Sequence, residues 1–247
     1  MLELNKIYNM DCMEGMKQFP EKGIDLVITD PPYLHVKGGM KSKKYNVGTW
    51  NGNSKMVNNL SNFGEVEINN FLDLIIPKMK KINMFIFCSK LQLQYYFTYI
   101  KNKKLKYDLL VWDKVKYSMK STKFFTSDIE YVVRIYQDGV SLKKIMTNDE
   151  IKSDINYYTK RQAYEQPRGK HETGKPVELI KKYIMVASEE NDIIFDPFIG
   201  SGTTAIAAMN TGRNFIGFEL DKGYYNIANK RIEAAQAQQS LFELGVR

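Results

Sequence analysis

The sequence predicts an α/β protein with a mostly parallel, twisted sheet covered by helices on both faces. Short apolar runs rich in β-branched residues alternate with segments of helical periodicity, which is typical of strand–helix–strand units. No helix fits between the runs 107–112 and 129–136, so these two strands are expected to be antiparallel. The other expected strands are 5–9, 24–29, 82–88, 214–218 and one that ends at residue 196, and the expected helices are 13–19, 69–81, 91–103, 176–187, 203–211 and 222–238.

Length and composition favour one soluble domain, 1–247, with a basic surface. Of the 247 residues, 43% are hydrophobic and 26% are charged, and the formal net charge is +8. A basic surplus of this size suits a polyanionic partner. No apolar stretch is long enough to cross a bilayer and no signal-peptide pattern opens the chain, so we expect a cytoplasmic protein. The two cysteines and two histidines show no metal-ligand spacing, so no metal site is expected.

Asp30-Pro31-Pro32-Tyr33 is the most informative stretch of the chain. It follows the run 24–29, which reads as a buried parallel strand, so Asp30 should lie at the carboxyl edge of the sheet, where ligands bind in open α/β folds. The prolines stiffen the turn and carry no N–H. A carboxylate, a carbonyl and an aromatic ring then suit an exocyclic amine of a nucleobase, although an ordinary Pro-Pro turn after a strand would give the same letters. Asp11, after the first strand, could be a second carboxylate at this edge or a helix N-cap.

Two polar segments interrupt the alternation of strands and helices. Residues 34–64 are expected to form a mobile basic loop, and residues 137–173 are the candidate target-recognition insert. Lysines and arginines interleaved with aromatic residues can contact phosphates and bases, and a solvated surface would look similar. The candidate DNA contacts are Lys37, Lys41, Lys43, Lys44, Lys143, Lys144, Lys160, Arg161 and Arg168.

A second motif, Gly200-Ser201-Gly202-Thr203-Thr204-Ala205, has the G-x-G-x-x-A pattern of nucleotide-binding turns. Glu219 follows at about the distance at which an acidic residue binds a ribose diol. A phosphate-binding P-loop would need Lys in place of Thr203. A nicotinamide dehydrogenase would leave the Asp30 motif without a role. S-adenosylmethionine has a ribose, an adenine and a sulfonium cation that tolerates carboxylate and aromatic neighbours, so it accounts for both motifs.

The chain resembles the DNA amino-methyltransferases that make N6-methyladenine or N4-methylcytosine. Asp30-Pro31-Pro32-Tyr33 is similar to the catalytic motif of that family, and the stretch from Asp196 to Gly202 is similar to its cofactor motif. The catalytic motif comes first, which is the permuted order of the beta class with its Rossmann-like methyltransferase fold. The stretch His171 to Pro176 resembles a third family segment, with Glu172 and Gly174 as departures.

The resemblance implies specific roles for several residues. Asp11 and Cys12 would lie against the cofactor adenine, although Met10 replaces the usual Gly before that Asp, and Lys175 would lie near the methionine carboxylate. The implied cofactor-binding set is Asp11, Cys12, Asp30, Lys175, Asp196, Phe198, Gly200, Ser201, Gly202, Thr203, Thr204 and Glu219. The implied partner is double-stranded DNA, and a homodimer is left open.

The expected reaction is methyl transfer from S-adenosylmethionine to the N6 amine of an adenine flipped out of duplex DNA. Asp30 and the Pro31 carbonyl would accept the two N–H groups so that the nitrogen lone pair points at the methyl group, with Tyr33 stacked on the base. Asp as the first motif residue is the commoner form among adenine enzymes of the resembled family. The resemblance also implies a place in a restriction–modification system. The alternatives are an N4-cytosine enzyme, an RNA adenine methyltransferase and a non-catalytic nucleic-acid-binding partner.

Overall fold

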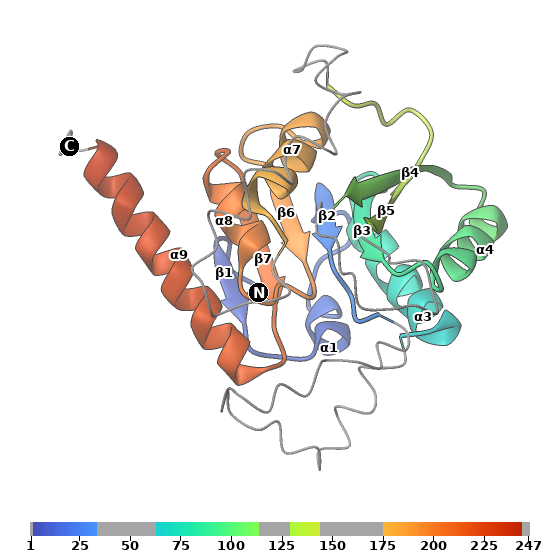
Figure 1. Cartoon of the computed structure of the whole chain (residues 1–247), viewed down its shortest axis with the longest axis horizontal. Coiled ribbons are helices and arrows are strands. Elements are labelled where there is room, and N and C mark those ends of the chain that lie inside the picture. The colour runs from blue at the N-terminus through green and yellow to red at the C-terminus, as the bar shows by residue number, and fades with distance from the viewer. Residues whose placement is uncertain (1, 34–62, 114–128, 144–174, 244–247) are drawn as a thin grey trace, which may run out of the picture.

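The computed structural model describes residues 2–33, 63–113, 129–143 and 175–243, with side chains described as far as residue 238. Strands and short helices alternate along most of this part of the chain (Figure 1). The strands are β1 (Lys6–Tyr8), β2 (Leu26–Thr29), β3 (Asn83–Cys88), β4 (Lys106–Asp113), β5 (Ile129–Tyr136), β6 (Ile193–Asp196) and β7 (Asn214–Phe218). The helices are α1 (Cys12–Met16), α3 (Glu65–Ile75), the 3-10 helix η1 (Ile76–Lys78), α4 (Leu93–Lys103), α7 (Val177–Ala187), α8 (Thr203–Met209) and α9 (Lys222–Glu243).

The described strands form one seven-stranded sheet in the order β1-β7-β6-β2-β3-β5-β4. The pairs from β1 to β3 are all parallel, whereas β5 is antiparallel to both β3 and β4. The predicted fold class and the predicted antiparallel pair are therefore confirmed. Because β5 runs backwards, its first residues lie at the carboxyl edge of β3, with Tyr131 opposite Cys88.

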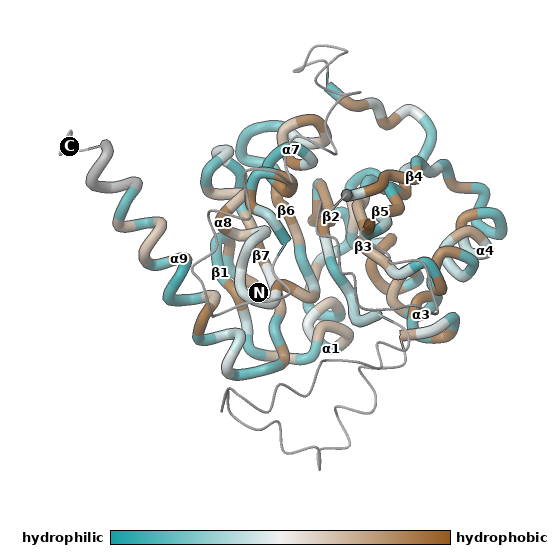
Figure 2. The backbone as a smooth tube through the Cα atoms, in the orientation of Figure 1, coloured by the Kyte–Doolittle hydropathy of each residue, from teal (hydrophilic) through white to brown (hydrophobic). Residues whose placement is uncertain are grey.

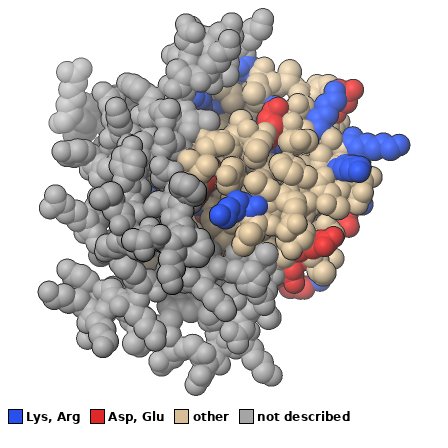
Figure 3. Space-filling model, turned by 45° about the vertical axis from the view of Figure 1, so that its right-hand side comes forward, with Lys and Arg blue, Asp and Glu red and all other residues tan. Residues whose placement is uncertain are grey.

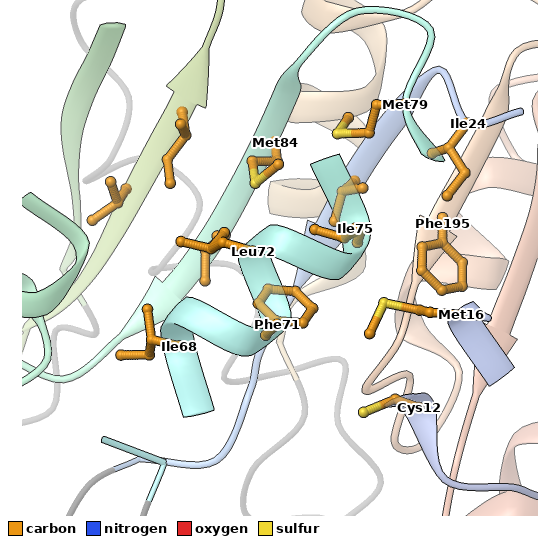
Figure 4. Close-up of a cluster of buried hydrophobic side chains, with 14 of the residues drawn as sticks. Cys12, Met16, Ile24, Ile68, Phe71, Leu72, Ile75, Met79, Met84 and Phe195 are labelled. Atoms are coloured by element: carbon orange, nitrogen blue, oxygen red, sulfur yellow. The ribbon is translucent and has the colours of Figure 1, made fainter. Parts of the chain in front are cut away.

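Helices cover both faces of the sheet, as the sequence predicts. One hydrophobic core lies between the sheet and α1, α3 and α4, and Figure 4 shows Phe71 and Leu72 of α3 in it, together with Met16, Met84 and Phe195. The other core lies between the opposite face and α7, α8 and α9. Figure 2 shows the corresponding hydropathy pattern, with apolar colour concentrated on the strands of the sheet. In the described part of the chain, no helix is long and apolar enough to cross a membrane.

Several helix boundaries differ from the prediction, and both differences at α3 have a local reason. Helix α3 starts four residues early because the Glu67 carboxylate accepts from the Gly64 N–H at 3.0 Å and caps the first turn. It gives way to η1 at Ile76 because Pro77 has no N–H to continue the helix. Helix α9 continues to Glu243 and extends away from the sheet toward the C-terminus in Figure 1.

Strands β6 and β2 are neighbours in the sheet, but the helices that follow them lie on opposite faces. Helix α8, which follows β6, belongs to one face, and α3, the first described helix after β2, belongs to the other. This arrangement defines a topological switch point, where open α/β sheets bind ligands beyond the carboxyl ends of their strands. The Asp30 motif follows β2 and the glycine motif follows β6, so the fold brings both motifs to this crevice.

Candidate active site

The corner that follows β2 presents a carboxylate and an aromatic ring beside a stiff turn. The Oδ2 atom of Asp30 contacts the Lys175 ammonium, whereas its Oδ1 atom is buried and has no hydrogen-bond partner among the described residues. The carbonyl of Pro32 accepts from Gln92 Nε2 at 3.0 Å, which fixes the end of the turn. No hydrogen bond to the Pro31 carbonyl occurs within the described residues. An unpartnered, buried carboxylate oxygen costs free energy unless a donor reaches it, so this corner is built to receive one.

Lys175 joins the corner to a second carboxylate, that of Glu130. The Lys175 Nζ atom lies 3.1 Å from Glu130 Oε2, and the Tyr33 hydroxyl donates to the same oxygen at 3.0 Å. The ammonium also lies 5.5 Å from the Tyr33 ring centroid and 5.0 Å from that of Phe87. The structure therefore places Lys175 directly against Asp30 and Glu130, and its contact with the methionine carboxylate stays a prediction.

Burial sets the ionisation of this cluster. Burial raises the pKa of the Asp30 carboxyl above its ordinary value, and the nearby Lys175 ammonium offsets only part of that effect. Burial lowers the pKa of Lys175, but Asp30 and Glu130 outweigh it and the net direction is upward, so the ammonium stays protonated. Burial and the two carboxylates raise the pKa of the Tyr33 hydroxyl, which therefore remains a hydrogen-bond donor.

A pocket of about 190 Å³ opens beside this corner, lined by Tyr33 after β2, by residues 88–90 at the end of β3 and by the first residues of β5. Its lining includes Glu130 and Tyr33, together with Cys88 and Ser89 at the end of β3. The pocket has an aromatic wall next to the Asp30 carboxylate, which is the combination that a flat ring bearing an amine requires.

The two glycines of the turn after β6 have different surroundings. Gly200 and Gly202 have φ values of +54° and +84°, which favour glycine, and Gly202 is the N-cap of α8. A Cβ atom on Gly202 would lie 3.1 Å from the Cβ of Ala228 on α9, whereas a Cβ on Gly200 would meet nothing closer than the Phe198 carbonyl at 4.0 Å. Gly202 is therefore needed for helix packing, and Gly200 faces open space at the carboxyl edge of the sheet.

Asp196 supports this turn with both of its carboxylate oxygens. They accept from Thr29 Oγ1 at 2.8 Å, from Thr204 Oγ1 at 2.6 Å and from the Phe198 N–H at 3.1 Å. Burial raises the pKa of Asp196 to about 7, against the effect of those hydrogen bonds. Asp196 and Thr204 thus stabilise the turn through buried hydrogen bonds. Their direct contact with a cofactor stays a prediction, as does that of the buried Thr203.

Glu219 lies beside the glycine turn, as its spacing predicts. Its Oε2 accepts from the Gly200 N–H at 2.9 Å and its Oε1 accepts from the Asp221 N–H at 2.7 Å. Each carboxylate oxygen can accept a second hydrogen bond, so a ribose diol has acceptors here. Burial is the main cause of a raised pKa at Glu219.

Asp11 is the N-cap of α1, because its Oδ1 accepts from the N–H groups of Met13 and Glu14. It also follows β1, at the same edge as Glu219, so both readings of this residue are compatible. The adjacent Cys12 is buried in the core, and burial raises the pKa of its thiol to about 12. Phe198 packs edge-on against Phe63, with ring centroids 5.6 Å apart. Cofactor contacts of these residues remain predictions.

Three residues of the site escaped the sequence analysis. Glu130 is the most important, and the predicted antiparallel strand 129–136 already implies that its first residues lie at the active edge. Gln92, fully buried, bonds the carbonyls of Pro32 and Phe63. Arg231 on α9 donates to the Ser201 carbonyl at 2.6 Å and to its hydroxyl at 2.8 Å, which ties the last helix to the glycine turn. Nothing in the sequence around Gln92 or Arg231 distinguishes them from other polar residues.

Most of the predicted DNA contacts lie outside the described residues, namely Lys37, Lys41, Lys43, Lys44, Lys144, Lys160, Arg161 and Arg168. Lys143 is described, and its position does not support a DNA contact near the site. It pairs with Glu189, and its N–H donates to the Val186 carbonyl at 2.8 Å, beside the end of α7 and the amino end of β6. That is the opposite edge of the sheet from Asp30.

The described surface carries little of the basic surplus of the chain. Within the described residues, acidic side chains slightly outnumber basic ones, so the surplus belongs to the remaining segments. In Figure 3 the described part of one face is largely uncharged, with both signs interspersed along its rim. No group of His, Cys, Asp and Glu within the described ranges could hold a metal ion.

Comparison with known proteins identifies the family. Residues 24–230 match the model of the N6/N4 family described as DNA methylase, a span that contains both motifs. The chain belongs to this family. The resemblance to S-adenosylmethionine-dependent DNA amino-methyltransferases is thereby confirmed, without a choice between adenine and cytosine as the target.

Curated relatives agree with this assignment. The chain is 27% identical to the type II methyltransferase M2.MboI of Moraxella bovis over 91% of this chain and 86% of that one. It is 28% identical to the type II methyltransferase M.HinfI of Haemophilus influenzae, over 98% of this chain and 72% of that one.

Two solved structures share the fold. One is a complex of M1.HpyAVI with S-adenosylmethionine, with a TM-score of 0.62, 24% identity and coverage of 92% of this chain and 98% of that one. The other is the cytosine-N4-specific PvuII DNA methyltransferase, with a TM-score of 0.63, 17% identity and coverage of 93% of this chain and 90% of that one.

Proposed function

We propose that this DNA methylase transfers a methyl group from S-adenosylmethionine to the N6 amine of an adenine flipped out of double-stranded DNA. The observation that carries the proposal is the Asp30 corner, where a buried carboxylate oxygen has no partner among the described residues beside an aromatic-walled pocket. It lies across the switch point from a glycine turn whose open side suits a nucleoside.

The residues around the glycine turn fit S-adenosylmethionine. Gly200 leaves open space for a close approach, and the Glu219 carboxylate beside it offers acceptors for a ribose diol. When bound, S-adenosylmethionine supplies a methyl group whose bond to sulfur breaks as its bond to the amine nitrogen forms. Ser201, with its carbonyl and hydroxyl held by Arg231, keeps the turn in one conformation for that ligand.

The chain itself positions the amine. Asp30 Oδ1 accepts one N–H and the Pro31 carbonyl accepts the other, so the nitrogen can pyramidalise and turn its lone pair toward the methyl group. The Asp30 carboxylate then stabilises the positive charge that develops on this nitrogen, and one N–H proton leaves to Asp30 or to solvent. Tyr33 stacks on the base, which cannot reach this corner while it is paired in the duplex.

Adenine is proposed over cytosine because the first residue of the catalytic motif is Asp. N4-cytosine methylation is the second candidate, and it is favoured by the structural likeness to the cytosine-N4-specific PvuII enzyme. Both targets carry an amine conjugated to a ring, so the Asp30 geometry serves either one.

The test is to express the wild-type chain and an Asp30→Ala variant in a host that lacks DNA methylation. The host DNA is then digested to nucleosides, which are identified by mass spectrometry, and long-read sequencing locates the modified motif. The proposal predicts N6-methyladenine with the wild-type chain only. N4-methylcytosine alone would overturn the choice of adenine, and the absence of both products would overturn the proposed reaction.

A further inference from the structure

Glu130 is a buried carboxylate of the site that the reaction as described does not use. Its side chain is 13% exposed, that of Lys175 is 11% exposed, and the two are joined at 3.1 Å. Its Oε2 also accepts the Tyr33 hydroxyl at 3.0 Å, so a single oxygen holds both the cation and the aromatic residue of the catalytic corner. Glu130 comes from β5, the strand whose reversed direction brings its first residues to the active edge.

Lys175 lies between two carboxylates. Among the described contacts, Asp30 and Glu130 both bind its ammonium. If Lys175 had only Asp30 as a partner, the two would form a neutral, desolvated pair whose carboxylate is already occupied. With Glu130 in place, the ammonium has a second acceptor, so it is not held by Asp30 alone.

This sharing of the ammonium matters because methyl transfer moves positive charge onto the amine nitrogen. A carboxylate that is fully paired with an ammonium would stabilise that charge less, and it would have fewer lone pairs free for the amine. The Tyr33 hydroxyl is the second group that Glu130 holds, and this bond fixes the ring on which the base would stack.

We propose that Glu130 is a positioning residue of the methyl-transfer reaction. By binding Lys175 and the Tyr33 hydroxyl, it keeps the Asp30 carboxylate available to the target amine and the Tyr33 ring in its stacking orientation. This inference rests on the proposed function, and Glu130 itself need not touch the base or the cofactor.

The test compares Glu130→Gln with Glu189→Gln, a matched control at the opposite edge of the sheet that also removes a lysine-paired carboxylate. The glutamine keeps the size of the side chain and an oxygen acceptor for Tyr33, so the fold should survive. The measurements are the single-turnover methylation rate at saturating DNA and S-adenosylmethionine, the Kd for S-adenosylmethionine, and the melting temperature. The DNA carries the motif found by sequencing.

The expected result for Glu130→Gln is a methylation rate about 10- to 100-fold lower, as for other lost transition-state interactions, with the Kd within about threefold of wild type. Glu189→Gln should match wild type in all three measurements. A Glu130→Gln rate equal to that of wild type would overturn the inference. A loss of cofactor binding or of melting temperature that matches the loss of rate would also overturn it, because the role would then be structural.

A double variant, Glu130→Gln with Lys175→Met, separates charge sharing from a general loss of polarity. Because Glu130 and Lys175 act through one contact, the loss of rate in the double variant should be smaller than the product of the losses in the two single variants. Independent, multiplicative losses would contradict the shared role. If the wild-type chain methylates no base amine in DNA, the proposed function fails, and this inference fails with it. If the wild-type chain is active and Glu130→Gln is equally fast, only the inference fails.

Discussion

The glycine turn after β6 and the Asp30 corner after β2 follow neighbouring strands, yet they differ in how far their carboxylate oxygens are hydrogen-bonded. Both oxygens of Asp196 and both of Glu219 accept hydrogen bonds from the protein, and Arg231 binds Ser201 twice. In the corner, one oxygen of Asp30 is buried without a partner among the described residues, and two carboxylates share one lysine.

The contrast separates two tasks of one active site. The polar groups of the glycine turn are hydrogen-bonded within the protein, as expected of a surface that binds the same cofactor in every cycle. The corner keeps a buried acceptor that the amine of a bound base can use at the moment of reaction. Groups that stabilise the fold and groups reserved for the transition state should therefore respond differently to substitution.

The largest effect should come from Asp30→Ala. It removes the acceptor that orients the amine, so the single-turnover methylation rate should fall by about 10²- to 10³-fold or more. Asp138→Ala is the control, since Asp138 is an exposed carboxylate that pairs with Lys106 away from the corner. A rate for Asp30→Ala near that of wild type would show that the corner does not act on the amine.

Gly200→Asn should weaken the cofactor turn selectively. Asn tolerates a positive φ, but its side chain would enter the open space beside the Glu219 carboxylate. The Kd for S-adenosylmethionine, measured by calorimetry, should rise about 10-fold or more, which is about 1.4 kcal/mol. Gly139→Asn is the matched control, because Gly139 has a φ of +78° with nothing within 4 Å of its Cβ position. Equal affinities in the two variants would place the cofactor elsewhere.

DNA binding should depend on lysines outside both regions. Replacing Lys41, Lys43 and Lys44 with Ala should weaken DNA binding several-fold and reduce the slope of log K against log salt by about 0.9 for each phosphate that the variant no longer neutralises. The control carries the same charge change at the amino edge of the sheet, with Lys78, Lys81 and Lys101 replaced by Ala. Equal effects of the two triple variants on DNA affinity, measured by fluorescence anisotropy, would argue against the predicted basic loop.

The smallest effect on methylation, and a measurable one on stability, is expected for Asp196→Asn. Burial raises the pKa of Asp196 to about 7, whereas the unfolded chain loses this proton near its ordinary value of 3.8. Between these values the folded state binds more protons, so the buried carboxyl makes the wild type lose stability as pH rises, by at most about 1.4 kcal/mol per pH unit. The free energy of unfolding of Asp196→Asn should therefore rise relative to that of wild type between pH 4 and pH 7. Parallel denaturation curves over this range would contradict the buried-carboxyl account.

The sequence is informative where a motif and a strand end coincide, and silent where contacts join distant segments. Asp30, Gly200 and Glu219 each follow an apolar run, so their shared edge could be predicted, and the antiparallel strand 129–136 followed from the missing helix. Glu130, Gln92 and Arg231 act through contacts with segments far away in the chain, and no spacing rule connects them. Lys143 shows the converse: its charge suits DNA, but its contacts with Glu189 and Val186 lie at the amino edge of the sheet.

The most direct test of the division between the two regions is the affinity of the Asp30→Ala variant for S-adenosylmethionine, measured by calorimetry on the preparation used for the methylation assay. The account predicts a Kd within about threefold of wild type, together with the loss of methyl transfer, because the glycine turn is completed without Asp30. A Kd weakened as strongly as in Gly200→Asn would contradict the account, since the two motifs would then form a single binding surface.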